Sequence, residues 1–380
     1  MADSLSLRRF LSYGVAEATP DHVTISRTRR LFDEVTHQAV FKFVLTEVAR
    51  RGLLKGKTIG IDATTLEANA AMRSIVRRDS GESYLEYVRK LAQQAGIDPT
   101  DEDAVRRMDR KRKKKTSNDD WVNPHDPDAE VTKMKDGTTH FAYKSEQAVD
   151  LETGAIVAIT TQGGAVGDTT SVQQTLPKAG LAIAEQMDTA TAHGEYRVQE
   201  LQEVVTDKGY HSGAGLLEMS TMVRTYVSVP QQPRRKWDGK ADQQAAVYAN
   251  KRRVQGERGK SLLRRRGELL ERPFAHQYET GGLRRLHLRG RSNVAKRVLL
   301  QAAAFNLALI LRSITKAGTP RGLADLKQTL SCAFVRILAA LYQLGAATGS
   351  SAEDTEHIPL RSFPPKPTSR NSHCRRKAPF

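Results

Sequence analysis

The sequence has few cysteines and no apolar run long enough to span a bilayer. Its two cysteines, Cys332 and Cys374, lie in unlike surroundings, which indicates neither a disulfide framework nor a zinc site and fits a reducing cytoplasm. We also find no signal peptide and no basic amphipathic helix with bulky apolar anchors. These absences favour a cytoplasmic protein with no membrane partner.

The net charge of the chain is strongly positive. It is +17 over 380 residues, with an isoelectric point near 9.9. Lysine and arginine residues that neutralise phosphates release condensed counterions, so nucleic acid is the expected partner. An anionic membrane surface is the alternative, but the absence of apolar anchors makes it the weaker one.

The first candidate site residue is Asp62, in the stretch K-T-I-G-I-D-A-T-T-L-E-A-N at residues 57–69. Ile59 and Ile61 alternate with small residues, which predicts a buried strand that runs out at Asp62. A carboxylate there is costly to bury without a partner. We therefore expect Asp62 to face a metal ion, a cation or a ligand cleft.

Strands and helices alternate in the middle of the chain. Residues 139–150 and 155–162 predict a β-hairpin. A helix is predicted to start at Asp168, and capping chemistry is a sufficient explanation for that residue. Asp207 stands at the tip of the next short strand, and a helix and a further strand follow. This order predicts an α/β fold in which helices cover a sheet.

A third acid, Glu271, lies on a predicted helix with basic neighbours. Its apolar neighbours and Arg272 are consistent with a surface ion pair or a site group, and taken alone it is best explained as an ion pair. Three carboxylates that converge from separate elements repel one another unless divalent cations lie between them, and Mg²⁺ prefers oxygen ligands. Two such ions can activate the attacking oxygen and stabilise the leaving oxygen in phosphoryl transfer. We therefore expect Asp62, Asp207 and Glu271 to converge on metal.

The outer parts of the chain are predicted from helical periodicity and composition. Residues 294–313 predict an apolar core helix, and the first fifty residues predict a basic helical unit that either binds DNA or packs with a solvated basic face. The expected division is a basic helical segment at 1–54, a catalytic domain at 55–314 with a charged insertion at about 70–137, a helix at 315–344 and a disordered tail at 345–380.

Three segments of the chain carry a resemblance to a known family. G-I-D-A-T-T-L-E-A-N, V-T-D-K-G-Y-H-S and E-R-P-F-A-H…G-G-L-R-R-L-H-L-R-G-R resemble, in order, the catalytic signatures of bacterial insertion-sequence transposases of the DDE class. The likeness runs roughly from Asp3 to Arg312. It implies a ribonuclease-H-like mixed sheet flanked by helices. The expected location is then the bacterial cytoplasm, in association with the nucleoid.

The resemblance also implies roles for named residues. Asp62, Asp207 and Glu271 would be the catalytic and metal-binding triad for Mg²⁺, which Mn²⁺ can replace. The implied reaction is hydrolysis at the ends of the element, followed by attack of the freed 3′-hydroxyl on target DNA, with double-stranded DNA as the partner of a homodimer. The residues expected at the active site or on DNA are Lys208, Tyr210, His211, Arg272, Arg284, Arg285, Arg289 and Arg291.

The sequence departs from the family pattern at several positions. Many relatives carry Tyr and Arg before the helix Glu and Lys after it, where this chain has Arg264, Gly267 and Tyr278. Relatives also usually have more sequence before the position of Ala2, so we expect part of the N-terminal domain to be missing. Two alternatives stay open: a metal-dependent nuclease of the same fold, and an inactive truncated transposase that only binds DNA.

Overall fold

The computed structural model describes residues 4–112, 116–134, 136–194, 196–231 and 236–316. The predicted helix at 315–344, beyond Lys316, and the predicted tail at 345–380 lie outside these residues. The strands are β1 (Thr58–Glu67), β2 (Val76–Arg77), β3 (Trp121–Val122), β4 (Glu130–Lys133), β5 (Thr139–Asp150), β6 (Ile156–Gly163), β7 (Glu203–Thr206) and β8 (Arg224–Val227).

The described helices precede, separate and follow these strands in the sequence. They are α1 (Leu5–Phe10), α2 (His22–Leu31), α3 (Glu34–Arg50), α4 (Tyr84–Gln94), α5 (Glu102–Lys111), α6 (Asp168–His193), α7 (Gly213–Met222), α8 (Ala241–Gln255), α9 (Glu257–Glu279) and α10 (Arg291–Thr315), with 3₁₀ turns η1 (Met72–Ser74) and η2 (Lys208–Tyr210).

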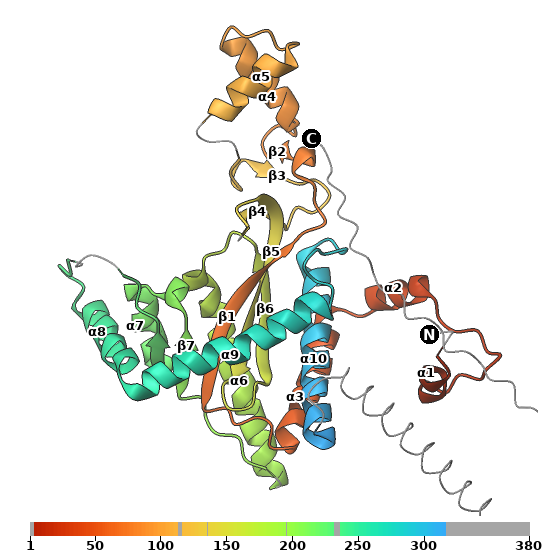
Figure 1. Ribbon diagram of the computed structural model, residues 1–380, viewed down its shortest axis with the longest axis vertical. Helices are drawn as coiled ribbons and strands as arrows, with labels where there is room; N and C mark the ends of the chain where they lie inside the picture. Colours follow the sequence, from red (N-terminus) through yellow and green to blue (C-terminus); the bar gives the residue numbers. More distant parts are fainter. Residues whose placement is uncertain (1–3, 113–115, 135, 195, 232–235, 317–380) are drawn as a thin grey trace, which may run out of the picture. The chain divides into compact units, whose positions relative to one another are not determined.

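The centre of the fold is a six-stranded mixed sheet (Figure 1). β1 pairs antiparallel with β5 and parallel with β7, and β7 pairs parallel with β8. β6 and β4 both pair antiparallel with β5, at different parts of that strand. This mixed sheet with flanking helices confirms the predicted ribonuclease-H-like class. The predicted hairpin at 139–150 and 155–162 is confirmed as β5 and β6.

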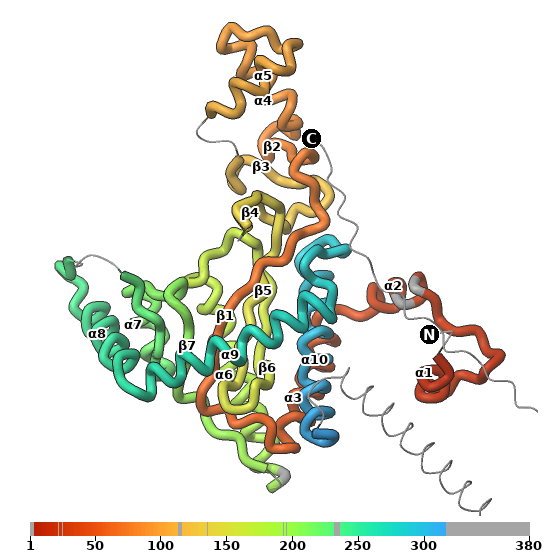
Figure 2. Tube along the Cα trace, viewed as in Figure 1, coloured from red at the N-terminus to blue at the C-terminus, as the bar shows by residue number. Residues whose placement is uncertain are grey.

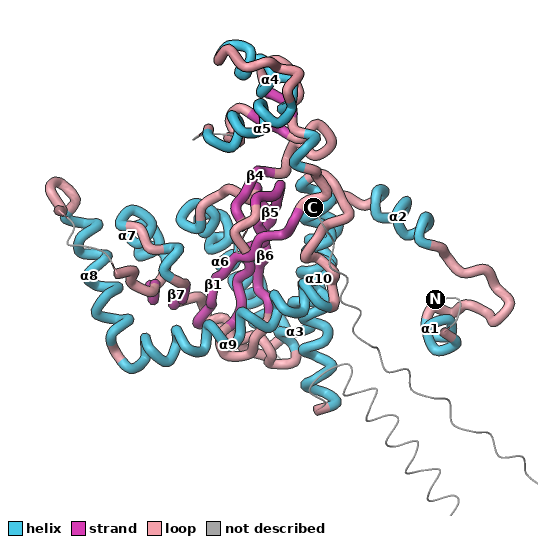
Figure 3. The backbone as a smooth tube through the Cα atoms, turned by 45° about the horizontal axis from the view of Figure 1, so that its top comes forward, coloured by secondary structure: helices cyan, strands magenta, loops and turns pink. Residues whose placement is uncertain are grey.

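Helices α9 and α6 lie on opposite faces of the sheet (Figures 1 and 3). On one face Gln147 of β5 donates to Gln277 of α9 at 2.7 Å. The next residue back along β5, Glu146, accepts a bond from Ser171 of α6. Because neighbouring residues of a strand point to opposite faces, these two contacts assign the two helices to the two sides.

The approach of α9 to β1 depends on a glycine. A Cβ atom added at Gly60 would lie 2.5 Å from Leu270 Cδ1 and 2.8 Å from Leu151 Cδ2. Further along, the Tyr278 hydroxyl bonds to the Thr64 hydroxyl and donates to the Thr65 carbonyl. Thr64 lies four positions after Gly60 on the strand, an even offset, so both residues face α9.

Helices α3 and α10 pack side by side on the sheet (Figure 2). Phe41, Val44, Leu45 and Val48 of α3 are buried in the main hydrophobic cluster, so this part of the N-terminal segment belongs to the core. Among the described helices, α10 alone is long and apolar enough to cross a membrane. The helix contacts α3 and β6, and this packing explains its apolar composition. It is the predicted core helix.

The charged insertion leaves the sheet after β1 and returns at β4 and β5. The Ala68 amide donates to the Phe141 carbonyl at 2.8 Å, which holds the two ends of the excursion together. The insertion has a small hydrophobic cluster of its own, built from Val88, Ala92 and Val105 of α4 and α5.

Two predicted boundaries were wrong. β1 does not run out at Asp62 but continues to Glu67, because β5 pairs with it over its whole second half. The basic run at 245–259, whose composition predicts one helix, is divided: α8 ends at Gln255 and α9 starts directly after Gly256. Glu271 therefore lies in the middle of a long helix.

We expect Gly60→Val to destabilise the fold by about 2 kcal/mol, because the added carbons overlap Leu270 and Leu151. Gly267→Ala in α9 is the control. No atom lies within 4 Å of its added Cβ, so it should stabilise the fold by about 0.5–1 kcal/mol. Urea unfolding of both variants measures the two changes. Equal stabilities of the Gly60→Val variant and the parent would contradict the close packing of α9 on β1.

Candidate active site

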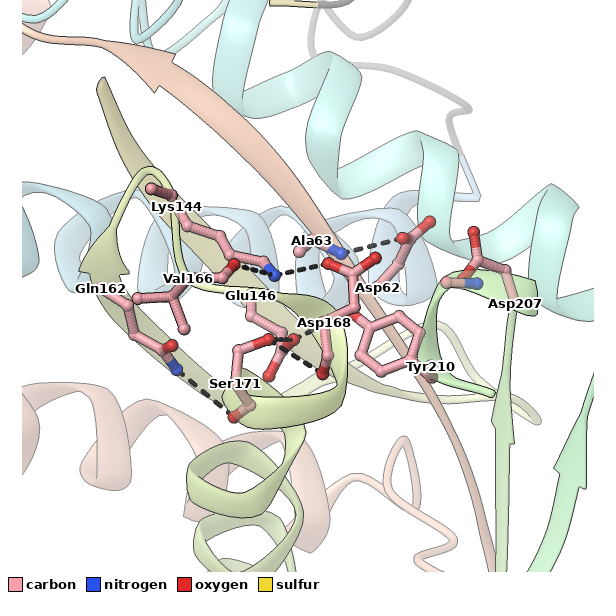
Figure 4. A network of polar contacts seen from close by, with 12 residues as sticks. Asp62, Ala63, Lys144, Glu146, Gln162, Val166, Asp168, Ser171, Asp207 and Tyr210 are labelled. Carbon is pink, nitrogen blue, oxygen red and sulfur yellow. Dashed lines mark hydrogen bonds and ion pairs between the residues drawn. The ribbon is translucent and has the colours of Figure 1, made fainter. Parts of the chain in front are cut away.

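Asp62 lies on β1, and Asp207 directly follows the neighbouring parallel strand β7 and caps η2. Gly60 of β1 pairs with Val205 of β7. Two residues further along each segment, the same register brings Asp207 next to Asp62. Adjacent strands are about 4.8 Å apart, so the two carboxylates share one edge of the sheet. Both residues are partly exposed, as a group that binds a ligand must be. Figure 4 shows them along one rim, together with Asp168.

Both oxygens of the Asp62 carboxylate have partners. Oδ1 accepts a hydrogen bond from the Ala63 amide at 2.8 Å, and Oδ2 lies 2.8 Å from Nη2 of Arg266. The Arg266 side chain is only 12% exposed and comes from α9, one turn before Leu270. The sequence pattern did not identify Arg266, because it is one of three consecutive arginines on a basic helix.

Glu271 does not join the two aspartates as α9 is positioned. It is exposed on the helix, whereas Leu270 and Gln277 are buried against the sheet. Leu270 packs at Gly60 and Tyr278 bonds to Thr64, so Glu271 lies within the stretch of α9 that spans Asp62. Within the described residues, no group of three or more His, Cys, Asp or Glu side chains could hold a metal ion. The triad therefore stays a prediction.

A fourth acid, Asp168, belongs to this edge of the sheet. Gly167 is the N-cap of α6, and the Asp168 carboxylate instead forms an ion pair with Lys144 of β5, whose side chain is 7% exposed. A Cβ atom added at Gly209 would lie 2.3 Å from Asp168 Oδ2 and 3.1 Å from Asp207 Oδ1. Helix capping alone therefore does not explain Asp168, and Gly209 is required by the approach of its carboxylate.

Tyr210 is buried beneath the carboxylates of the site. It is 1% exposed, and its hydroxyl donates to Oε1 of the fully buried Glu146 at 2.8 Å (Figure 4). Burial, followed by the charges of Glu146, Asp168 and Asp62, raises the pKa of Tyr210 well above 10.0. The prediction that Tyr210 lines the active site or contacts DNA needs correction, because the ring is enclosed and its hydroxyl is used internally.

Burial also raises the pKa of Glu146 above its ordinary value of 4.5. Ser171 and Tyr210 donate to the same oxygen and partly oppose the shift. The other oxygen, Oε2, is buried with no hydrogen-bond partner among the described residues. Burial thus favours the neutral acid in this position.

The chemistry of the Asp62–Asp207 pair fits a divalent cation. Carboxylate oxygens are the ligands that Mg²⁺ prefers, and Asp62 Oδ2 already holds a cationic group, the Arg266 guanidinium. Asp62 and Asp207 are the residues that would hold the ion. Glu271 would join them only if its side chain turned toward this edge.

The predicted phosphate contacts lie at the surface. Lys208 is exposed and His211 is partly buried. The Arg284 carbonyl accepts a bond from the Glu67 amide at 3.0 Å, and Arg289 Nε donates to the Asn69 carbonyl at 3.0 Å, so this segment follows the far end of β1. The exposed arginines of the prediction are Arg272, Arg284, Arg285, Arg289 and Arg291.

We expect Glu146→Gln to remove a pH dependence of stability. The pKa of Glu146 is raised in the folded state. Its contribution to the free energy of unfolding is therefore fully present below about pH 4.5 and is lost as pH rises through the folded-state pKa. The glutamine carbonyl keeps an acceptor for Tyr210 without the charge. The variant should be as stable as the parent at pH 4 and more stable at pH 8, as measured by urea unfolding. Parallel pH profiles for the two proteins would contradict a buried, shifted Glu146.

Comparison with known proteins gives one family match. Residues 229–311, which contain α8, α9 and most of α10, match the model of a transposase DDE domain. No curated protein and no solved structure matches the chain. The matched segment includes Arg266, Glu271 and the exposed arginines that follow α9, and the ribonuclease-H-like sheet supplies the two aspartates. The match supports a transposase function of the DDE class.

Proposed function

We propose that this chain is a DNA transposase that hydrolyses phosphodiester bonds at the ends of an insertion sequence and transfers the freed strands to target DNA. The observation that carries the proposal is the neighbouring position of Asp62, on β1, and Asp207, directly after the parallel strand β7, under a helix from the matched domain. The positive net charge of +17 supports a polyanionic substrate.

The reaction exchanges phosphodiester bonds. Water attacks a phosphorus at the end of the element, the bond to the 3′-oxygen breaks, and that oxygen leaves as a hydroxyl. The same hydroxyl then attacks a phosphorus of the target strand and displaces the 3′-oxygen there. Divalent ions, when bound, supply charge that activates the attacking oxygen and stabilises the leaving oxygen. Mg²⁺ is the expected ion, with Mn²⁺ as its substitute.

The residues of the chain hold and orient the DNA in this proposal. Asp62 and Asp207 would hold divalent ions at this end of the sheet, and the ions would supply positive charge at the reactive phosphate. The arginines after α9 flank Glu67, five residues along β1 from Asp62, which is a distance of about 17 Å. That spacing corresponds to about five base-pair steps of duplex DNA. We expect a homodimer, because two paired ends require two copies of the site.

We expect Asp62→Asn and Asp207→Asn each to lower metal-dependent nicking of supercoiled plasmid at least about 100-fold, the scale for loss of one transition-state contact. Glu271→Gln should do the same if it completes the triad. Glu268→Gln is the matched control, since Glu268 is also exposed on α9, one turn earlier. Full nicking by Asp62→Asn would refute the catalytic assignment.

A strand-transfer assay with labelled element ends separates a transposase from a nuclease of the same fold. Joined products that require both Asp62 and Asp207 are the expected result. Cleavage of the ends without any joining to target DNA would instead assign the chain to the nucleases.

We expect Arg285→Ala and Arg289→Ala each to reduce the slope of log K against log salt by about 1 in DNA binding. Each exposed arginine would otherwise neutralise one phosphate. Lys42→Ala is the control, because Lys42 pairs with Glu185 on α6 and lies outside this segment. Fluorescence anisotropy over a salt series measures the slopes. An unchanged slope in both arginine variants would show that DNA takes another path.

A further inference from the structure

Arg266 makes a contact that the predicted catalytic roles do not explain. Its Nη2 lies 2.8 Å from Asp62 Oδ2 and also donates to the Ile61 carbonyl at 3.4 Å. Its Nε is buried and has no acceptor among the described residues. The guanidinium is thus nearly enclosed, bonded to the edge of β1, with one donor unused.

A divalent cation and Arg266 compete for the same oxygen. Asp62 Oδ1 accepts a bond from the Ala63 amide, which leaves Oδ2 as the oxygen best able to face a ligand, and Arg266 covers it. Two positive charges within about 4 Å repel by several kcal/mol at the effective dielectric of a protein surface. A cation bound by Asp62 therefore requires the guanidinium to move away.

A displaced Arg266 needs another anion. Leaving a mostly buried guanidinium without one is costly, because its donors would lose their acceptors in a low dielectric. A DNA phosphate at the Asp62 edge meets this need, since a guanidinium presents paired donors that match two phosphate oxygens. Its unused Nε–H is one of these donors.

We propose that Arg266 couples cation binding at Asp62 to DNA binding. Without DNA the guanidinium occupies Asp62; in the DNA complex it bonds to a phosphate and leaves Oδ2 to the cation. This inference rests on the proposed function, because it needs Asp62 to hold a cation. The coupling is reciprocal, so DNA tightens cation binding and the cation tightens DNA binding.

The test measures Mn²⁺ binding by electron paramagnetic resonance titration of the full chain, with and without a short DNA duplex whose own Mn²⁺ binding is subtracted. We expect Arg266→Gln to bind Mn²⁺ about 10-fold more tightly than the parent without DNA, within the usual range of coupling factors. Adding the duplex should tighten Mn²⁺ binding by the parent about 10-fold as well, and it should leave the Mn²⁺ affinity of the variant unchanged. Arg264→Gln, an exposed neighbour on α9, should behave like the parent.

Equal Mn²⁺ affinities of Arg266→Gln and the parent without DNA would overturn the coupling. Arg266→Lys is the second variant if the glutamine protein does not fold. It keeps the charge on a shorter side chain, which reaches Asp62 Oδ2 less well, so a smaller gain in affinity is expected and no gain contradicts the proposal.

Asp62→Asn separates this inference from the proposed function. If it abolishes Mn²⁺ binding while Arg266→Gln matches the parent, the coupling alone is wrong. If Mn²⁺ binds equally well without the Asp62 carboxylate, the proposed metal site is wrong too.

Discussion

The packing of α9 across β1 is the contact on which the candidate site depends. Gly60 lets Leu270 approach the strand, and the bonds of Tyr278 to Thr64 and Thr65 fix the other end of the contact. Glu271 lies between these two points, and Arg266, one turn before Leu270, reaches Asp62. A shift of α9 by one turn would bring a different set of charges to the aspartate, so the close packing and the charge pairing are one constraint.

Several carboxyl groups lie close together at one end of the sheet, and three kinds of interaction stabilise them there. Asp62 and Asp168 are each paired with a mostly buried cation, Arg266 and Lys144. Glu146 is buried behind them, where the low dielectric favours its neutral form. Asp207, directly after the strand, is partly exposed and accepts a local bond from the Gly209 amide. The repulsion among these acids is therefore reduced in a different way at each position.

Sequence patterns predicted the parts of this fold that local chemistry determines. The alternation in β5 and β6 and the apolar run in α10 were sufficient to predict those elements. The position of Asp207 followed from the short strand before it. Arg266 and Asp168 could not be assigned in the same way, because their roles depend on β1 and β5, which are distant in sequence. The orientation of Glu271 depends on the phase of a helix whose true start, directly after Gly256, had no strong signal.

The small hydrophobic cluster of α4 and α5 has a consequence for how freely the insertion can vary. Within this insertion β4 pairs with β5, and Trp121 and Ala129 belong to the main core. The part between the paired strands β2 and β3, which contains α4 and α5, starts and ends at neighbouring positions, so its length mainly changes the entropy of closing a loop. That entropy grows with the logarithm of length, by about 0.6 kcal/mol per doubling. Relatives of this chain could therefore lengthen, shorten or replace the part with α4 and α5, and with it the surface that this part presents, without altering the register that brings Asp62 to Asp207.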